Sequence, residues 1–308
     1  AQGSPMSAKG SPVSAEARPS QIVDVVVHTH WDREWYLSRE ATLARLEAVM
    51  EEVLGLLDAG ALPSFLFDGQ TVALRDLLAV APAQLQQRLR HHAAAGRLVL
   101  GPWYVSADEF LVSGESLLRN LEIGLADAAA FGVPQRLGYL PDTFGHVAQM
   151  PQILAQFGIR HAVVWRGADA THDRFDWVAP DGTAAGTVFL TEGYYLHPLN
   201  APDGEAALLE LLQRLAARRA PGVQAPLLLT HGGDHLAPRP ELPARIDAFN
   251  AAGQGFHLRV THLLEHAQVL LAAGGPRETL HGELRRNAQA FVLPDVLSAR
   301  RPLKRAHQ

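Results

Sequence analysis

The sequence contains no cysteine. This absence excludes disulfide bonds and every metal site built on thiolates, so any bound metal must be held by histidine, aspartate or glutamate. A chain without cysteine is also compatible with a reducing compartment. We therefore expect a cytoplasmic protein.

Long hydrophobic runs and an excess of basic residues are also absent. No apolar stretch approaches the roughly 20 residues that a membrane helix needs, so we expect no membrane partner. The net charge of -5 and the pI of about 6.3 argue against a nucleic-acid partner. Residues 1–20 are rich in Ala, Ser, Gly and Pro and lack the apolar core of a signal peptide. We expect them to form a disordered leader.

Hydrophobic residues make up 47% of the chain, which is enough for a substantial core. Short apolar runs alternate with longer segments whose apolar residues recur every three or four positions. This alternation predicts β-α-β units and a parallel sheet. Seven strands are expected, at Ile22–Val27, Ser64–Phe67, Leu98–Trp103, Leu137–Leu140, Ala162–Trp165, Pro226–Thr230 and Phe256–Val260. Helices are expected at Thr42–Leu57, Gln84–Ala95, Ser116–Ala130, Gly204–Ala217 and Arg239–Ala251.

The strand count favours an α/β fold, a seven-stranded parallel (β/α) barrel over residues 21–275. In "FDWVAPDGTAAGTVFL" two short apolar runs flank Pro180-Asp181-Gly182, which predicts a short β-hairpin inserted after strand five. Residues 276–308 are basic, lightly apolar and unpatterned, and we interpret them as a linker.

Polar and aromatic side chains follow the carboxyl ends of six of the expected strands. Functional residues of parallel α/β folds collect at that edge, so the pattern predicts an active site there. The residues are His28, His30, Asp32 and Trp35 after strand one, Asp68 and Gln70 after strand two, Tyr104, Asp108 and Glu109 after strand three, Asp142, Phe144 and His146 after strand four, Arg166 after strand five, and His231, Asp234 and His235 after strand six.

His30 and Asp32 lie two residues apart just past a strand, where an extended segment points both side chains to the same face. Imidazole nitrogen and carboxylate oxygen suit a divalent ion such as zinc, and Asp142 would supply a third ligand. An isolated H-x-D can instead be a strand cap followed by a turn residue. The matching aspartate after strand four favours the metal site.

The other aromatic and histidine residues at this edge have two interpretations. Trp35 and Phe144 are either core residues or a platform on which a sugar ring stacks. His28 and His146 are either core residues or side chains that orient a ligand.

Six motifs, in this order and at suitable spacing, resemble the N-terminal catalytic domain of the retaining, zinc-dependent α-mannosidases of glycoside hydrolase family 38. The bacterial branch, which includes mannosylglycerate hydrolases, is the most similar. The motifs are "HTHWDREWY", "DGQT", "GPWYVSADEFLVSGESLLRNL", "GYLPDTFGHVAQMPQIL", "VWRG" and "GGDH". The resemblance implies a seven-stranded α/β barrel and an α-mannoside or mannosylglycerate-type substrate.

The resemblance also implies a role for individual residues. Two zinc ligands match His30 and Asp32. Asp142 matches the nucleophile, which is also a zinc ligand, and Asp234 matches the proposed acid/base. The residues that match or neighbour the sugar subsite are Trp35, Phe144, Arg166 and His235.

Family members continue through a helical domain, whose histidine is the fourth zinc ligand. None of the fifteen histidines here matches it, and only His235 is a local substitute. We therefore expect residues 276–308 to lead towards a helical domain and the 308-residue chain alone to be a poor or inactive mannosidase. A homo-oligomer formed through the face that the next domain covers is also possible.

Two other functions stay open. A metal-dependent carbohydrate deacetylase of barrel type also binds its metal through one aspartate and two histidines. An inactive carbohydrate-binding barrel fragment would keep the fold alone. "GPWYVSADEF" and "GGDH" favour the mannosidase.

Overall fold

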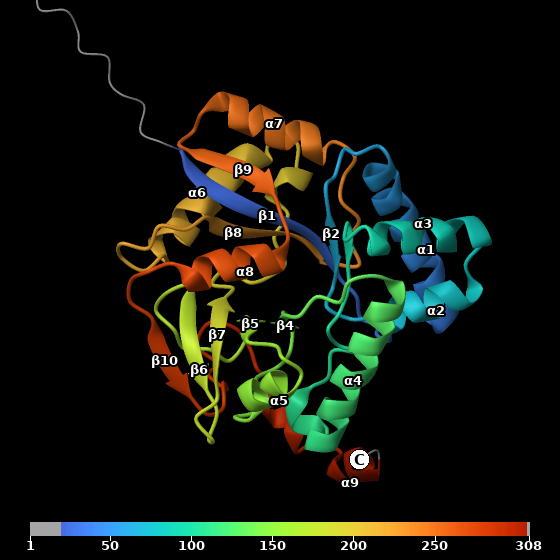
Figure 1. The fold of residues 1–308 in the computed structure, drawn as a ribbon, viewed down its shortest axis with the longest axis vertical. Helices are drawn as coiled ribbons and strands as arrows, with labels where there is room; N and C mark the ends of the chain where they lie inside the picture. Colours follow the sequence, from blue (N-terminus) through green and yellow to red (C-terminus); the bar gives the residue numbers. More distant parts are fainter. Residues whose placement is uncertain (1–19, 307–308) are drawn as a thin grey trace, which may run out of the picture.

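A computed structural model describes residues 20–306 and shows an α/β fold whose helices surround two sheets (Figure 1). The first sheet has the strand order β3-β2-β1-β8, and β9 also pairs with β1. All of its pairings are parallel. Its strands are β1 (Gln21–His30), β2 (Phe65–Phe67), β3 (Leu98–Val99), β8 (Leu227–Asp234) and β9 (Phe256–Val260).

The second sheet has the order β10-β6-β7-β5-β4 and is mixed. The strands β6 and β7 form an antiparallel hairpin directly after β5, as the sequence predicted. Because β7 also pairs with β5 in parallel, the hairpin is part of the sheet. The strands are β4 (Gly138–Leu140), β5 (His161–Val164), β6 (Arg174–Val178), β7 (Ala184–Phe189) and β10 (Glu278–His281).

The α/β class and the parallel pairing are confirmed, but the closed seven-stranded barrel is not. Within residues 20–306, no ladder joins β3 to β4, and the contact there is the single parallel bridge between Leu100 and Pro134. Pro102 and Pro134 lack the N–H group that a continuing ladder would need. The two sheets therefore meet at this edge without merging.

Helices cover the sheets, and the five expected ones are all present. The first, α1, begins after Ser38, whose side chain accepts a hydrogen bond from the Ala41 amide. The helices are α1 (Arg39–Asp58), α2 (Val72–Val80), α3 (Ala83–Ala94), α4 (Gly114–Phe131), α5 (Met150–Gln156), α6 (Gly204–Ala217), α7 (Leu242–Ala252), α8 (Leu263–Ala272) and α9 (Arg301–Ala306). The 3-10 turns are η1 (Glu109–Leu111), η2 (Pro198–Asn200) and η3 (Pro294–Leu297).

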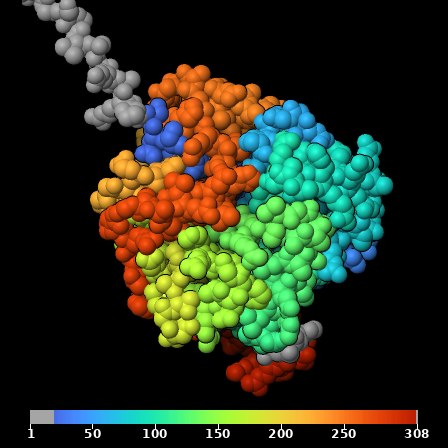
Figure 2. All heavy atoms as spheres, viewed as in Figure 1, coloured from blue at the N-terminus to red at the C-terminus, as the bar shows by residue number. Residues whose placement is uncertain are grey.

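The chain after residue 275 is more ordered than the sequence suggests. It contains β10, η3 and α9, and the main chain of Leu284 pairs with that of His146. In Figure 2 the red C-terminal residues lie at the lower edge of the molecule, beside the green surface of α4. The leader expected at residues 1–20 lies, except for residue 20, outside the described residues. Among residues 20–306, no helix has both the length and the hydropathy to cross a membrane.

The strand β1 determines where the site forms, because it is longer than expected and reaches His30. Its last three residues pair with Gly232, Gly233 and Asp234 of β8. A Cβ atom on Gly232 would lie 2.0 Å from the carbonyl oxygen of His28, so a larger residue would separate the strands. The register places His30 directly opposite Asp234.

Asp24, near the other end of β1, is buried and bonds to buried His266 and to Arg259, whose side chain is 53% exposed. It accepts hydrogen bonds from Arg259 Nε at 2.7 Å and from His266 Nδ1 at 2.9 Å. Burial alone would raise the pKa of Asp24, but these two partners lower it below its ordinary value. A lowered pKa means that the ionised form stabilises the fold above the unfolded-state pKa of about 3.9.

Asp24→Asn is expected to lower the free energy of unfolding at pH 7 by about 3 kcal/mol, the low end for breaking a buried ion pair. The difference between the variant and the wild type should narrow as the pH falls from about 3.9 through the folded-state pKa, where wild-type Asp24 is protonated too. Urea unfolding at several pH values measures this. A difference that stays constant down to the acid transition would contradict the ionic explanation.

Candidate active site

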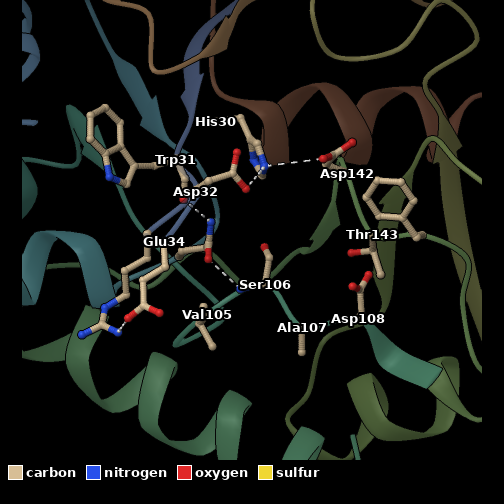
Figure 3. A pocket seen from close by; sticks show the side chains of 13 residues that line it. His30, Trp31, Asp32, Glu34, Val105, Ser106, Ala107, Asp108, Asp142 and Thr143 are labelled. Carbon is tan, nitrogen blue, oxygen red and sulfur yellow. Dashed lines mark hydrogen bonds and ion pairs between the residues drawn. The ribbon is translucent and has the colours of Figure 1, made fainter. Parts of the chain in front are cut away.

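The carboxyl ends of β1, β2 and β4 open onto a cavity of about 320 Å³ (Figure 3). Charged, aromatic and small side chains from the four loops after β1, β2, β3 and β4 form its wall. The lining residues are His30, Trp31, Asp32, Arg33, Glu34, Gln70, Val105, Ser106, Ala107, Asp108, Asp142, Thr143 and Phe144.

The three predicted metal ligands meet at this cavity. His30 Nε2 lies 3.6 Å from Asp32 Oδ1 and 3.8 Å from Asp142 Oδ2 (Figure 3). His30 ends β1, Asp32 follows two residues later, and Asp142 lies two residues past β4. The three side chains that the sequence placed at the carboxyl ends of the strands therefore lie close together in the structure.

The cluster is close to, but not in, the geometry of a formed metal site. Among residues 20–306, no group of three or more His, Asp or Glu side chains is placed to hold a metal ion. A tetrahedral zinc with ligand distances of about 2.0–2.2 Å separates its donor atoms by roughly 3.4 Å. The separations from His30 exceed this by a few tenths of an ångström, which side-chain rotation can close. The donor types and the convergence of these residues fit a divalent ion.

His30 is fixed from behind by Asp68, the first residue after β2. The distance from His30 Nδ1 to Asp68 Oδ1 is 2.9 Å, and the two side chains are 3% and 1% exposed. Burial alone would lower the pKa of His30, but the charges of Asp68 and Asp32 raise it well above its ordinary value.

Asp142 is held by Arg166, a residue that the sequence assigned to the sugar subsite. Arg166 donates to Asp142 Oδ1 from Nε at 2.9 Å and from Nη2 at 2.6 Å. Its guanidinium lies over the rings of Phe144 and Trp165, at 4.3 and 4.1 Å from their centroids. Burial raises the pKa of Asp142, and its attraction to His30 and Arg166 opposes the rise. Arg166 itself does not line the cavity.

Asp234 lies beside His30, does not line the cavity, and is held by Tyr194. The Tyr194 hydroxyl donates to Asp234 Oδ1 at 2.8 Å, and the ring of Tyr194 lies 5.1 Å from that of His30. Burial, with the charges of Asp142 and Asp32, raises the pKa of Asp234, whereas the bond from Tyr194 lowers it.

Trp35 and His235 lie outside the cavity lining. Trp35 is 62% exposed and packs edge-on against Tyr36 and His235. The His235 ring lies 4.4 Å from the Trp31 ring at a tilt of 34°, and its Nε2 accepts the Asp32 amide at 3.1 Å. Burial lowers the pKa of His235. His235 therefore anchors the loop that carries Asp32, and the substrate-binding roles of both residues stay predictions.

His28 and His146 are both buried. His28 Nε2 lies 2.9 Å from the Tyr194 carbonyl oxygen, and burial lowers the pKa of His28 to about 4. His146 Nδ1 lies 2.7 Å from Glu109 Oε1, which joins the loops that follow β3 and β4. Both histidines support the loops of the site from within the core.

Sequence reasoning noted Asp68 without giving it a role and missed Tyr194. The position of Asp68 after β2 was a usable signal, because that edge already held the other polar residues. Tyr194 follows β7 in the apolar run "GYYL", and nothing in that run indicates a neighbouring carboxylate.

Comparison with known proteins identifies relatives. A protein of Halalkalibacterium halodurans, named "Putative mannosylglycerate hydrolase", is 36% identical over 227 residues, covering 68% of this chain and 25% of its own length. The crystal structure of an alpha-mannosidase from Enterococcus faecalis V583 superposes with a TM-score of 0.80 at 29% identity, over 86% of this chain and 31% of the other. A Mycobacterium smegmatis structure, described as a "putative polysaccharide deacetylase", shares the fold alone, with a TM-score of 0.54, 16% identity and coverage of 89% of this chain and 98% of the other.

The chain spans about a quarter of the length of the mannosylglycerate hydrolase relative and under a third of the alpha-mannosidase structure. Residues 20–276 match the N-terminal domain of glycosyl hydrolases family 38, over the part of the chain that carries His30, Asp32, Asp142 and Asp234. With its relatives and its structural neighbour in agreement, the chain belongs to glycosyl hydrolase family 38.

Proposed function

We propose that this domain carries the catalytic site of a retaining, zinc-assisted α-mannosidase. Its substrate is an α-mannoside, and mannosylglycerate-type compounds belong to this class. The observation that carries the proposal is the meeting of His30, Asp32 and Asp142 at one cavity, with Asp234 opposite His30 in the strand register.

We assign the two aspartates the two roles of a double displacement because their partners differ: Arg166 bonds Asp142, and the Tyr194 hydroxyl bonds Asp234. Asp142 attacks the anomeric carbon as the bond to the leaving oxygen breaks, and Asp234 gives its proton to that oxygen. Asp234 then takes a proton from the water that attacks the mannosyl-enzyme, which releases mannose with its original configuration. The first displacement inverts the anomeric carbon and the second inverts it again, so the configuration is retained.

The surroundings of the two residues support these roles. Arg166 bonds one oxygen of Asp142, which fixes the carboxylate and leaves the other oxygen, Oδ2, on the side of His30. Burial and nearby charges raise the pKa of Asp234, which favours the protonated form that a general acid needs.

His30, Asp32 and Asp142 would hold the divalent ion. When bound, zinc acts as a Lewis acid and a template for the vicinal hydroxyls of the sugar. The protein's part is to present one imidazole nitrogen and two carboxylates on one side of the cavity.

The experiment is an assay of the whole gene product on an aryl α-mannoside, with proton NMR to follow the first-formed sugar. We expect α-mannose first, loss of turnover on chelation and recovery with zinc. Measurement of acetate release from an N-acetylated oligosaccharide tests the deacetylase alternative. Acetate release without mannoside cleavage would reject the proposal, and a protein that only binds mannosides would match the inactive-fragment alternative.

The 308-residue chain alone is expected to turn over the same mannoside poorly. Zinc with one histidine and two carboxylates has three ligands from this chain, and Asp142 serves as both ligand and nucleophile. The comparison uses both proteins with added zinc at equal concentration. A chain that matches the whole gene product would show that the described residues form a complete site.

A further inference from the structure

We infer that Asp68 is a positioning residue, which holds His30 so that Nε2 faces the cavity. The distance from His30 Nδ1 to Asp68 Oδ1 is 2.9 Å, and Nε2 then lies nearest Asp32 and Asp142. The functional part of this inference rests on the zinc site proposed above. A carboxylate behind a histidine sets its tautomer and its ring orientation.

Asp68 is itself immobilised by donors on its second oxygen. Asp68 Oδ2 accepts the Trp31 amide at 2.9 Å and the side-chain amide of Gln70. Gln70 also donates to the Trp31 carbonyl oxygen at 3.0 Å and accepts the Ser106 amide at 2.6 Å. The network therefore connects the loops that follow β1, β2 and β3 around one carboxylate.

Three donors point at two oxygens, and this arrangement requires an aspartate. In Asp68→Asn, one of the two positions becomes an NH2 group, which cannot accept a hydrogen bond. If the amide nitrogen faces Trp31 and Gln70, two donors lose their acceptor inside the core. If it faces His30, Nδ1 must become the acceptor, and the proton moves to Nε2. A protonated Nε2 cannot bind a metal ion.

The chain contains a matched control at the other end of the same strand. Asp24 lies 2.9 Å from His266 Nδ1, and both side chains are as buried as the Asp68 pair. Within the described residues, however, His266 Nε2 has no hydrogen-bond partner, whereas His30 Nε2 faces two carboxylates. Asp24→Asn therefore removes the same kind of Asp–His pair without touching the cavity.

The test measures zinc affinity by competition with a chelator in the whole gene product. Asp68→Asn is expected to weaken zinc binding by about 10–100-fold, the range for partners of metal-ligating histidines. Asp24→Asn should lower the melting temperature but leave zinc affinity unchanged. Equal zinc affinity of Asp68→Asn and wild type would overturn the inference. If Asp68→Asn does not fold, Gln70→Met replaces it as the test variant. This substitution removes one donor to Asp68 Oδ2 and should give a smaller loss of zinc affinity.

A second readout needs no metal. The Nδ1–H proton of His30 should appear in the NMR spectrum of the wild type as an exchange-protected imidazole resonance, identified by its absence from His30→Ala. The resonance should be absent or shifted in Asp68→Asn and retained in Asp24→Asn. Its unchanged survival in Asp68→Asn would overturn the positioning role. If wild type binds no zinc yet shows this pattern, the proposed metal is rejected and the positioning of His30 by Asp68 is supported.

Discussion

Asp142→Asn in the whole gene product is expected to lower kcat on an aryl α-mannoside by at least about a thousandfold, the scale for removal of a catalytic nucleophile. An amide does not attack the anomeric carbon, and it is a poorer metal ligand than a carboxylate. Steady-state kinetics at saturating substrate measure the loss.

The structure indicates that this substitution leaves the shape of the site intact. Asparagine has the size of aspartate, and its Oδ1 can still accept the two hydrogen bonds from Arg166. Asp127→Asn is a matched control. Asp127, like Asp142, is 20% exposed and ion-paired with an arginine, but its partner is Arg75 and it does not line the cavity. We expect Asp127→Asn to retain the activity of the wild type.

Added azide separates loss of the nucleophile from general damage. In Asp142→Ala, azide can attack the bound α-mannoside directly from the opposite face, which gives β-mannosyl azide. A variant that regains turnover in this way has kept its acid and its subsite. Near wild-type turnover by Asp142→Asn without azide would exclude Asp142 as the nucleophile.

The sequence predicts the fold well where local signals are strong. The β-branched run before His28 and the three- to four-residue periodicity of α1, α4 and α6 locate these elements within a few residues. The closed barrel was not predictable in the same way, because closure depends on pairing between edges. Two prolines at the edge between β3 and β4 limit that pairing to one bridge.

The site also contains residues that the sequence could predict and residues that it could not. His30, Asp32 and Asp142 could be grouped because parallel strands bring their carboxyl ends to one edge. The partner of Asp234 could not, because Tyr194 lies forty residues away in the chain and reaches Asp234 through the fold. The strand β10 was missed for the same reason, since its partner β6 lies about a hundred residues earlier.

The exposed position of Trp35 was also not predictable. Trp35 follows a buried strand within a charged motif, and sequence alone cannot tell a ring that faces the cavity from one that packs on Tyr36. In the structure it is the contact with Tyr36 and His235 that places the ring.

Asp234→Ala is expected to reduce kcat/KM strongly for alkyl α-mannosides and little for dinitrophenyl α-mannoside. A poor leaving group needs a proton as its bond breaks, and general acid catalysis contributes about 10²–10⁴-fold. Dinitrophenolate leaves without that proton. The measurement compares kcat/KM of the variant and the wild type on both substrates.

Azide also tests the role of Asp234, and the expected product has the configuration opposite to that from Asp142→Ala. In Asp234→Ala the mannosyl-enzyme on Asp142 still forms from the dinitrophenyl substrate, but water attacks it slowly without a base. Azide needs no base, so it should accelerate turnover and give α-mannosyl azide, whereas Asp142→Ala should give the β-product. Azide, assayed with Asp142→Ala and with Asp234→Ala, thus assigns the roles of both carboxylates. Equal losses on both substrates, or a β-azide product from Asp234→Ala, would remove Asp234 from the acid/base role and leave Tyr194 bonded to a carboxylate whose function is structural.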